Sequence, residues 1–251
     1  METVRTVVIT GGGGHLGRAV ARWWAKPGMQ IVLVDRDREK LEACRAELAA
    51  SGAYLTIIAA DITARDKIRV AIASLPETLW QAPPSLIMTH GLSGKEPGSG
   101  GLRLGELDRT AWQRVLDANL SSIVFTIESF LPFMKQAGGG RIVLVSSAAG
   151  LSASPTAALS YSVSKAGVAA LPRILSRELA ASHVLINAVA PGKFVNPDWP
   201  DDPAKVASYE ASIPLGRIGS AEEIAELIGF LSSGANTYLT GQTILQDGGR
   251  L

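Results

Sequence analysis

The sequence predicts an α/β fold in which a doubly wound parallel sheet of seven strands carries helices on both faces. Three observations indicate this fold. Short apolar runs rich in β-branched residues recur along the 251 residues, helical segments separate them, and a glycine cluster follows the first run directly. Strands that alternate with helices form βαβ units, and such sheets are covered on both faces. No linker or change of composition divides the pattern, so residues 1–251 are expected to form a single domain.

Strands and helices alternate along the first ninety residues. The run TVRTVVIT predicts the first strand, QIVLVD the second and SLIMTH the fourth. The segments between these runs read as helices. The expected order is strand Thr3–Thr10, helix Leu16–Ala25, strand Gln30–Asp35, helix Arg38–Ala50, strand Tyr54–Ala60, helix Ala64–Leu75 and strand Ser85–His90.

The alternation resumes after the glycine-rich stretch Gly91–Gly105, which is expected to be a mobile loop. Residues Lys193–Ser212 contain three prolines, so one or two helical turns are expected there. The other elements, in order, are helix Leu107–Gln136, strand Arg141–Ser146, helix Ser160–Ala181, strand Val184–Ala190, helix Ala221–Ser232 and strand Gln242–Gln246.

Composition narrows the class of protein. The 24 basic residues nearly balance the 23 acidic ones, which indicates neither a nucleic-acid partner nor an anionic membrane surface. A single cysteine, Cys44, excludes an intrachain disulfide framework, fits a reducing compartment and is expected to pack in the core. The first strand leaves no room for a signal peptide, and no apolar run is long enough to span a bilayer. A soluble cytoplasmic protein is expected.

The glycine cluster Thr10–Gly17 (TGGGGHLG) lies between the first strand and the first helix. In that context glycines allow backbone amides to approach a pyrophosphate at the helix N-terminus. Asp35 ends the second strand at about the ~20-residue distance expected of an acid that binds adenosine ribose hydroxyls. Its carboxylate would repel a 2′-phosphate, which favours NAD over NADP, although Arg36 could pair with such a phosphate.

The two acidic residues at the ends of predicted strands, Asp35 and Asp61, each have a second interpretation. Asp35 could instead cap a helix N-terminus or be an ordinary loop acid. Asp61, followed by Ile62 at the end of the third strand, could hydrogen-bond an adenine amine or cap the next helix. The residues alone leave both alternatives open.

Tyr161 and Lys165 are four residues apart, one turn from each other on one helix face. A fixed ammonium lowers the pKa of a neighbouring phenol, and a phenol tuned in this way can exchange a proton with an alcohol oxygen. The alternative is an exposed Tyr/Lys pair on an ordinary helix. One helical turn brings such pairs together by chance.

Taken together, these features resemble the short-chain dehydrogenase/reductase family over essentially the whole chain. The resemblance implies a single-domain Rossmann fold and hydride transfer between NAD, or less readily NADP, and a secondary alcohol or ketone. The matching motifs are Thr10–Gly17, Asp117–Leu120, Arg141–Gly150, Tyr161 with Lys165, Asn187–Gly192, Pro214–Gly219, Glu222–Ala225, Thr240–Thr243 and Asp247–Gly249.

The resemblance implies a catalytic tetrad. Tyr161 would act as general acid/base, and Lys165 would lower its pKa and hold the nicotinamide ribose hydroxyls. Ser147 would stabilise charge on the substrate oxygen, with Ser146 as the alternative serine. Asn119 would anchor a water that relays protons past Lys165.

The resemblance also implies cofactor contacts and no metal site. Pro191 and Gly192 would close over the nicotinamide. The full set of implied cofactor contacts is Gly11, Gly14, His15, Leu16, Gly17, Asp35, Arg36, Asp61, Ile62, His90, Gly91, Tyr161, Lys165, Pro191, Gly192, Val195 and Asn196.

Three positions depart from the family pattern. His15 replaces the middle glycine of the loop, Met88-Thr-His90-Gly91 stands in place of the family's Asn-Asn-Ala-Gly after the fourth strand, and Asn196 replaces a threonine. The imidazole of His15 must point away or contact the ribose or phosphate, and His90 either contacts the cofactor or satisfies a local hydrogen-bond partner. Our hypothesis is that both imidazoles line the adenosine half of the cleft.

Three loops are expected around the nicotinamide: Leu92–Leu104, Ala148–Ser160 and Lys193–Ser212. The first is rich in glycine and is a candidate lid. The sequence does not identify the substrate, and the default expectation is a small or medium, largely apolar secondary alcohol or ketone that would contact Ser147 and Tyr161. The expected apolar wall consists of Leu151, Pro155, Phe194, Val195 and Trp199, and the nearby cations are Lys95, Arg103 and Lys193.

The resemblance further implies a homotetramer built on helices Leu107–Gln136 and Ser160–Ala181. Pro172 lies inside the second of these and should kink it beyond the catalytic turns. Two other functions remain open: a redox-neutral enzyme of the epimerase or dehydratase type, and a non-catalytic NAD-binding regulatory protein.

Overall fold

A computed structural model describes residues 6–94, 104, 107–154, 156–197 and 202–251. Seven strands form one sheet in the order β3-β2-β1-β4-β5-β6-β7, and all neighbouring pairs are parallel. The predicted doubly wound parallel sheet is therefore confirmed. The strands are β1 (Thr6–Thr10), β2 (Gln30–Asp35), β3 (Tyr54–Ala59), β4 (Ser85–Met88), β5 (Gly140–Val145), β6 (Val184–Pro191) and β7 (Thr243–Gln246).

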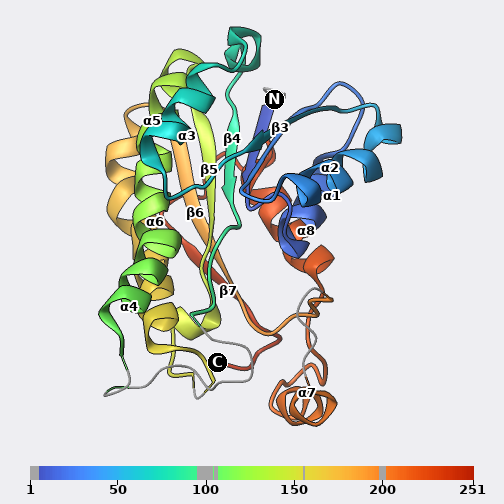
Figure 1. The fold of residues 1–251 in the computed structure, drawn as a ribbon, viewed down its shortest axis with the longest axis vertical. Helices are drawn as coiled ribbons and strands as arrows, with labels where there is room; N and C mark the ends of the chain where they lie inside the picture. Colours follow the sequence, from blue (N-terminus) through green and yellow to red (C-terminus); the bar gives the residue numbers. More distant parts are fainter. Residues whose placement is uncertain (1–5, 95–103, 105–106, 155, 198–201) are drawn as a thin grey trace.

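Helices cover both faces of the sheet, as Figure 1 shows. The core on one face includes residues of α1 (His15–Trp24), α2 (Arg38–Glu47) and α8 (Ala221–Ser232). The core on the other face includes residues of α3 (Arg65–Ala73), α5 (Ser122–Gln136) and α6 (Leu159–Ala180). Successive strand residues alternate between the two cores, because side chains of a strand point to opposite faces in turn.

Side-chain caps begin several helices where the sequence supplies a short polar residue. Asp37 caps α2 by accepting from the Lys40 amide, and Ser220 forms a capping box with Glu223 at the start of α8. Such caps satisfy amide groups that have no partner within the helix. Cys44 on α2 is buried in the core, and burial raises the pKa of its thiol to about 11, so it packs rather than reacts.

The predicted long helix Leu107–Gln136 is confirmed as helical without interruption from Arg109 to Gln136, but it is not α-helical throughout. It consists of α4 (Arg109–Leu116), a π-helical turn over Asp117–Ser121, and α5. The π turn carries Asn119, whose side chain is held by contacts outside the helix, as described below. By contrast, α6 continues without a break through the buried Pro172. The expected turns after Lys193 are α7 (Pro203–Glu210).

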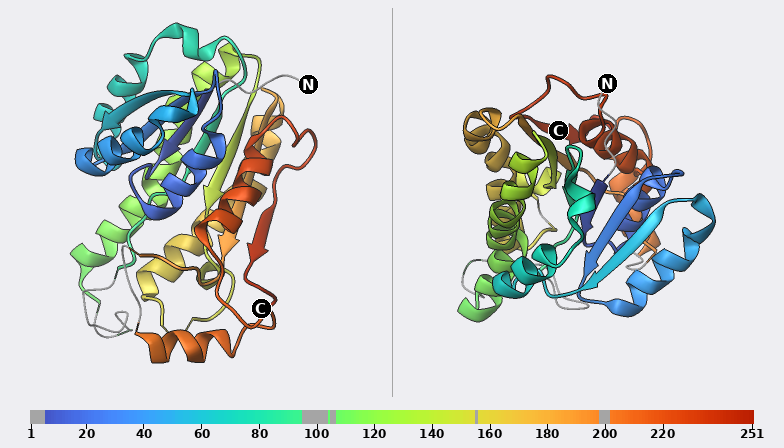
Figure 2. Two further views of the ribbon diagram at one scale, coloured as in Figure 1. Left: turned by 90° about the vertical axis from the view of Figure 1, so that its right-hand side faces the viewer. Right: turned by 90° about the horizontal axis from the view of Figure 1, so that it is seen from above.

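All seven strands end at one edge of the sheet because they are parallel. The segments that follow them, α7 and the C-terminus lie at that end of the molecule (Figures 1 and 2). The order reverses between β1 and β4, and ligands of open α/β sheets bind outside the carboxyl ends of strands at such a switch point. No helix within the described ranges combines the length and apolar character needed to cross a membrane.

Candidate active site

The first turns of α6 bring Tyr161 and Lys165 to the carboxyl end of β5. Gly150 lies against the Lys165 backbone so closely that a methyl group there would come within 2.5 Å of the Lys165 carbonyl carbon. The Ser146 hydroxyl donates to the Lys165 carbonyl oxygen at 2.7 Å. The predicted pair thus lies on one helix face that packs against the end of the sheet, and the alternative of an exposed surface pair is wrong.

Lys165 is almost completely buried, with only 4% of its surface exposed. Its ammonium donates to the Val145 carbonyl oxygen at 2.7 Å and lies 5.8 Å from the centre of the Tyr161 ring. Burial lowers the pKa of Lys165 to about 8, because a charge loses solvation in the interior. Lys165 is therefore a cation near its titration point at neutral to mildly alkaline pH.

Tyr161 differs from the sequence-based expectation in the direction of its pKa. Burial raises the pKa of the phenol, and a hydrogen bond with the Ser147 side chain opposes that rise. The chain's own groups do not produce the expected net lowering. That lowering remains a prediction for the complex with a positively charged nicotinamide.

The two candidate serines have separate roles in the structure. Ser146 is buried and its hydroxyl is committed to the α6 backbone. Ser147 is half-buried, caps a short 3-10 turn by accepting from the Ala149 amide at 3.2 Å, and bonds to Tyr161. Of the two, Ser147 faces the phenol, which agrees with its selection from the sequence.

Asn119 uses its whole side-chain amide within the protein. Its carbonyl oxygen accepts from the Leu92 amide at 2.6 Å, and its amide nitrogen donates to the Leu92 carbonyl at 2.9 Å and the Ser164 hydroxyl at 3.0 Å. The Ser164 hydroxyl in turn donates to the Tyr161 carbonyl at 2.7 Å. Asn119 therefore braces the segment after β4 against the catalytic turn of α6, and the π turn places it there.

Sequence reasoning missed Ser164 as part of this site. Its position three residues after Tyr161 predicts a neighbouring place on the helix, but its partner Asn119 lies 45 residues earlier in the chain. A methyl group on Gly91 would lie 3.2 Å from the Asn119 side-chain oxygen and 3.4 Å from the Lys165 ammonium. The glycine thus lets Asn119 and Lys165 converge.

The glycine loop has the features that a dinucleotide requires. Gly14 begins α1 without a side-chain cap, and the first turn of this helix holds no acidic residue. A Cβ on Gly17 would overlap the Gly11 carbonyl oxygen, so only glycine allows α1 to start this close to the loop. Leu16 is buried in the core behind the loop. Free amides at a helix N-terminus form an anion site, and the loop therefore fits a pyrophosphate.

Asp35 lies directly beside this loop. Its carboxylate accepts from the Gly13 amide at 3.2 Å and from the Asp37 amide at 3.1 Å. The alternative that Asp35 caps a helix is wrong, because Asp37 occupies that position in α2. Asp35 thus holds the loop and presents its carboxylate at the carboxyl end of β2, next to Arg36.

Asp61 forms a local turn at the end of β3. Its carboxylate accepts from the Thr63 amide at 2.9 Å and the Thr63 hydroxyl at 2.8 Å, and these bonds lower its pKa. The helix-capping alternative is wrong here too, since Ala64 is the residue that precedes α3. The neighbouring Ile62 is half-buried against the core.

The two unusual histidines lie in different environments. Both ring nitrogens of His90 have hydroxyl partners, Thr10 at 2.6 Å and Ser122 at 2.9 Å, which leaves neither nitrogen for direct contact with a cofactor. His15 is the first residue of α1, and its charge adds to the lowering of the Glu222 pKa at the start of α8. His90 has the local structural role that was its alternative interpretation.

The turn after β6 packs on the C-terminal segment. A methyl group on Gly192 would lie 2.8 Å from Asp247 Cβ, so this turn and the end of the chain are in close contact. Phe194 pairs with Gly219 and packs against the first core, so it is only partly available as a pocket wall. Val195 and Leu151 are exposed, and Asn196, which follows Val195 in sequence, is half-buried.

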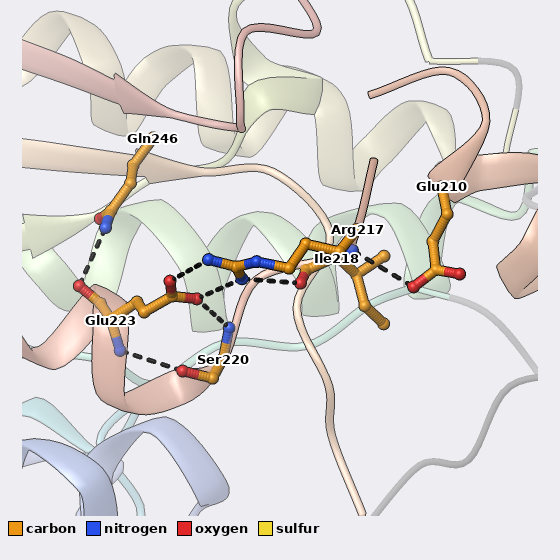
Figure 3. Close-up of polar contacts among 6 residues, drawn as sticks. All are labelled: Glu210, Arg217, Ile218, Ser220, Glu223 and Gln246. Atoms are coloured by element: carbon orange, nitrogen blue, oxygen red, sulfur yellow. Dashed lines mark hydrogen bonds and ion pairs between the residues drawn. The ribbon is translucent and has the colours of Figure 1, made fainter. Parts of the chain in front are cut away.

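A polar network anchors the segment between α7 and α8 (Figure 3). The Arg217 guanidinium donates to both carboxylate oxygens of Glu223, at 2.9 and 2.6 Å, and this ion pair lowers the pKa of Glu223 to about 2. Glu223 also accepts from the Ser220 amide, while its own carbonyl accepts from Gln246. The segment between α7 and α8 is therefore tied to the end of β7.

Several expected pocket residues lie outside the described part of the chain. They are Lys95, Arg103, Pro155 and Trp199, together with most of the candidate lid Leu92–Leu104. Among the described residues, no group of three or more His, Cys, Asp or Glu side chains could hold a metal ion.

Comparisons with known proteins match the chain nearly end to end. A family model described as enoyl-(acyl carrier protein) reductase matches residues 14–250. A 2-dehydro-3-deoxy-L-rhamnonate dehydrogenase (NAD(+)) of Sphingomonas sp. (strain SKA58) is 32% identical over 98% of this chain and 95% of its own. A cis-4-hydroxycyclohexanecarboxylate dehydrogenase of Sinomonas cyclohexanicum is 35% identical over 98% and 96%. A solved 3-oxoacyl-[acyl-carrier protein] reductase with bound NAD from Brucella melitensis superposes with a TM-score of 0.89 at 29% identity, covering 98% and 91%.

Proposed function

The chain belongs to the short-chain dehydrogenase/reductase family of NAD(P)-dependent oxidoreductases that act on alcohols and ketones, and from this premise we propose that it interconverts a secondary alcohol and a ketone with NAD, using Tyr161 as general acid/base. One observation carries the proposal: Tyr161, Ser147, Lys165 and Asn119 converge at the carboxyl end of β5, beside a glycine loop that fits a pyrophosphate.

In the proposed oxidation, Ser147 and Tyr161 hold the alcohol oxygen between their hydroxyl groups. Tyr161 takes the hydroxyl proton as its phenolate, and Ser147 donates to the oxygen while negative charge develops on it. When bound, the nicotinamide would supply the hydride acceptor for the carbinol carbon, and its positive charge would favour the phenolate of Tyr161. Lys165 holds its ammonium group within the buried site, and Asn119 holds the backbone of Leu92 by a hydrogen bond.

The serine pair provides a matched test. Ser147→Ala is expected to lower kcat/KM on the order of 100-fold, because it removes the donor to the developing oxyanion. Ser146→Ala is expected to change kcat only slightly and to destabilise the fold by about 1 kcal/mol, because it removes a buried bond to α6. Steady-state kinetics and thermal unfolding of both variants make the comparison. The opposite ranking of the two kinetic effects would assign the substrate contact to Ser146.

We propose a preference for NAD over NADP, based on the Asp35 carboxylate beside the glycine loop. Asp35→Asn is expected to lower the ratio of kcat/KM for NAD to that for NADP about 10-fold, because a neutral amide no longer repels a 2′-phosphate. Asp37→Asn, which alters the neighbouring helix cap, is the control and should leave the ratio unchanged. An unchanged ratio in Asp35→Asn would refute the proposed basis of selectivity.

We also propose a homotetramer in which α5 and α6 form a subunit interface. Both helices leave apolar side chains partly exposed, namely Val124, Phe125, Val163 and Ile174. Contiguous exposed apolar surface is typical of interaction sites. Sedimentation velocity measures the mass of the assembly, and a monomer at micromolar concentration would contradict this part of the proposal.

The direct test of function is a cofactor titration followed by a screen of secondary alcohols and ketones. Stoichiometric NADH formation from an alcohol supports the proposed reaction. Substrate turnover without net NADH would indicate redox-neutral chemistry, and NADH binding with no turnover of any substrate would indicate a regulatory protein.

A further inference from the structure

His90 lies in a hydrogen-bond chain whose direction can be assigned. The Ser122 hydroxyl donates its single proton to the Ala118 carbonyl at 2.9 Å, so toward His90 Nε2 it can only accept. Nε2 therefore carries the imidazole proton. In the neutral ring Nδ1 is then an acceptor, and the Thr10 hydroxyl donates to it at 2.6 Å.

The imidazole is neutral because of its surroundings. Burial lowers the pKa of His90 to about 3, and the nearby Lys165 ammonium adds to the effect. A second ring proton at Nδ1 would also displace the Thr10 donor from a 2.6 Å contact. Geometry and charge thus favour the same neutral form.

The hydrogen-bond chain through His90 joins the cofactor side of the site, at the glycine loop, to the catalytic side, at the turn that carries Asn119. Thr10 is the last residue of β1, immediately before the glycine loop, while Ser122 follows the π turn that holds Asn119. The backbone beside His90 makes the same connection, since the Thr89 hydroxyl donates to the Thr10 carbonyl at 2.9 Å and Leu92 pairs with Asn119. His90 is the side chain that spans the gap between these backbone contacts.

We propose that His90 is a positioning residue, which as a neutral Nε2-protonated imidazole sets the glycine loop at a fixed distance from the Asn119 turn and so couples cofactor binding to the catalytic end. The proposal rests on the proposed function for its kinetic readout. His90 acts through Thr10 and Ser122 and makes no cofactor contact of its own. The alanine that the family motif has at this place carries no side-chain hydrogen-bonding group that could link the two hydroxyls.

The tautomer is directly measurable. The chain holds three histidines, so 15N-histidine labelling gives three ring spin systems, and His90→Phe assigns one of them by its loss. We expect the His90 ring to remain neutral with its proton on Nε2 between pH 5 and 8. An imidazolium in this range, or a proton on Nδ1, would overturn the proposal.

The coupling is tested by the effect of each partner on the distant half of the site. Ser122→Ala, on the catalytic side, is expected to weaken NADH binding about 5- to 10-fold, the usual effect of losing one buried hydrogen bond. Thr10→Val, on the cofactor side, is expected to lower kcat by a similar factor. Neither cross-effect should appear in a protein in which His90 is already replaced by phenylalanine, because His90 is the link through which each substitution reaches the distant half of the site.

Ser129→Ala is the matched control, since Ser129 also donates to a carbonyl one turn earlier on α5 but has no histidine partner. It should leave NADH affinity unchanged. NADH affinity, measured by fluorescence, does not depend on finding the substrate, so a failure of the coupling can be told apart from a failure of the proposed reaction. If Ser122→Ala binds NADH like the native protein, or the cross-effects persist without His90, the proposal is wrong.

Discussion

Tyr161→Phe is expected to lower kcat by about three to four orders of magnitude while NADH binding changes less than ~3-fold. The substitution removes only the phenolic oxygen, and general acid–base groups contribute up to about 10⁴-fold. The ring stays, so the packing of α6 against the end of β5 is preserved. The bonds of Ser164 and Asn119 are also unaffected, because Ser164 donates to the Tyr161 backbone carbonyl and Asn119 donates to the Ser164 hydroxyl, so neither bond involves the Tyr161 side chain. Single-turnover kinetics and fluorescence titration of NADH separate the two quantities.

Tyr54→Phe is the matched control for this variant. Tyr54 lies at the start of β3 with 63% of its surface exposed, and its hydroxyl should have no influence on turnover. If Tyr161→Phe kept a kcat within 10-fold of the native enzyme, the assignment of Tyr161 as the proton-transfer group would fail. If it lost NADH binding as well, the variant would report a damaged cleft and not a missing proton donor.

Lys165→Met is expected to abolish turnover and at the same time to make the fold more stable. The buried ammonium has a pKa of about 8 against an ordinary 10.5, which corresponds to a folding penalty of roughly 3 kcal/mol at neutral pH. A methionine of similar length carries no charge, although the Val145 carbonyl loses its donor at a cost of about 1 kcal/mol. A net gain of about 1–3 kcal/mol in the free energy of unfolding is expected from urea denaturation.

The pH dependence of this gain has a definite sign. Because the folded pKa of Lys165 lies below the unfolded value, the unfolded chain binds more protons between pH 8 and 10.5. The penalty is therefore complete below about pH 8, falls as pH rises through this window and is absent above 10.5. The stability difference between Lys165→Met and the native protein should shrink over the same range.

Lys205→Met controls for the loss of a positive charge as such. Lys205 is exposed on α7, and its replacement should change the free energy of unfolding by less than about 0.5 kcal/mol. A Lys165→Met variant that is less stable than the native protein at pH 7 would contradict the destabilising role of the buried ammonium. Such a residue, costly to the fold and placed beside Tyr161, is typical of a functional site.

The sheet was predictable because its determinants are local. Short β-branched runs and the glycine loop identify strands and their order along the chain, and six of the seven strands agree with the predicted bounds to within two residues at each end. The helix through Asn119 was not predictable as a π turn. The sequence Leu107–Gln136 has ordinary helical character, and the turn coincides with bonds from Asn119 to residues 27 and 45 positions away.

The candidate site was likewise predictable from the sequence only in part. The motifs locate Tyr161, Lys165 and Ser147 in the sequence, but the capping alternatives for Asp35 and Asp61 were open until their partners were known. Neither acid caps a helix, because Asp37 and Ala64 occupy the starts of the following helices. Asp61 holds a local turn, whereas Asp35 bonds both to the nearby Asp37 amide and to the Gly13 amide of the glycine loop. The partners of a carboxylate depend on backbone geometry over a few residues, which residue preferences alone do not resolve.

The sequence by itself determined the parallel sheet, the family and the candidate catalytic residues, because these follow from local periodicity and motif spacing. Only the tertiary structure decided how the groups are held and charged. His90 bonds to a hydroxyl 80 residues away, and the pKa values of Tyr161 and Lys165 depend on burial by segments distant in the chain. Desolvation and long-range hydrogen bonds exist only after the chain has folded, so no local pattern records them.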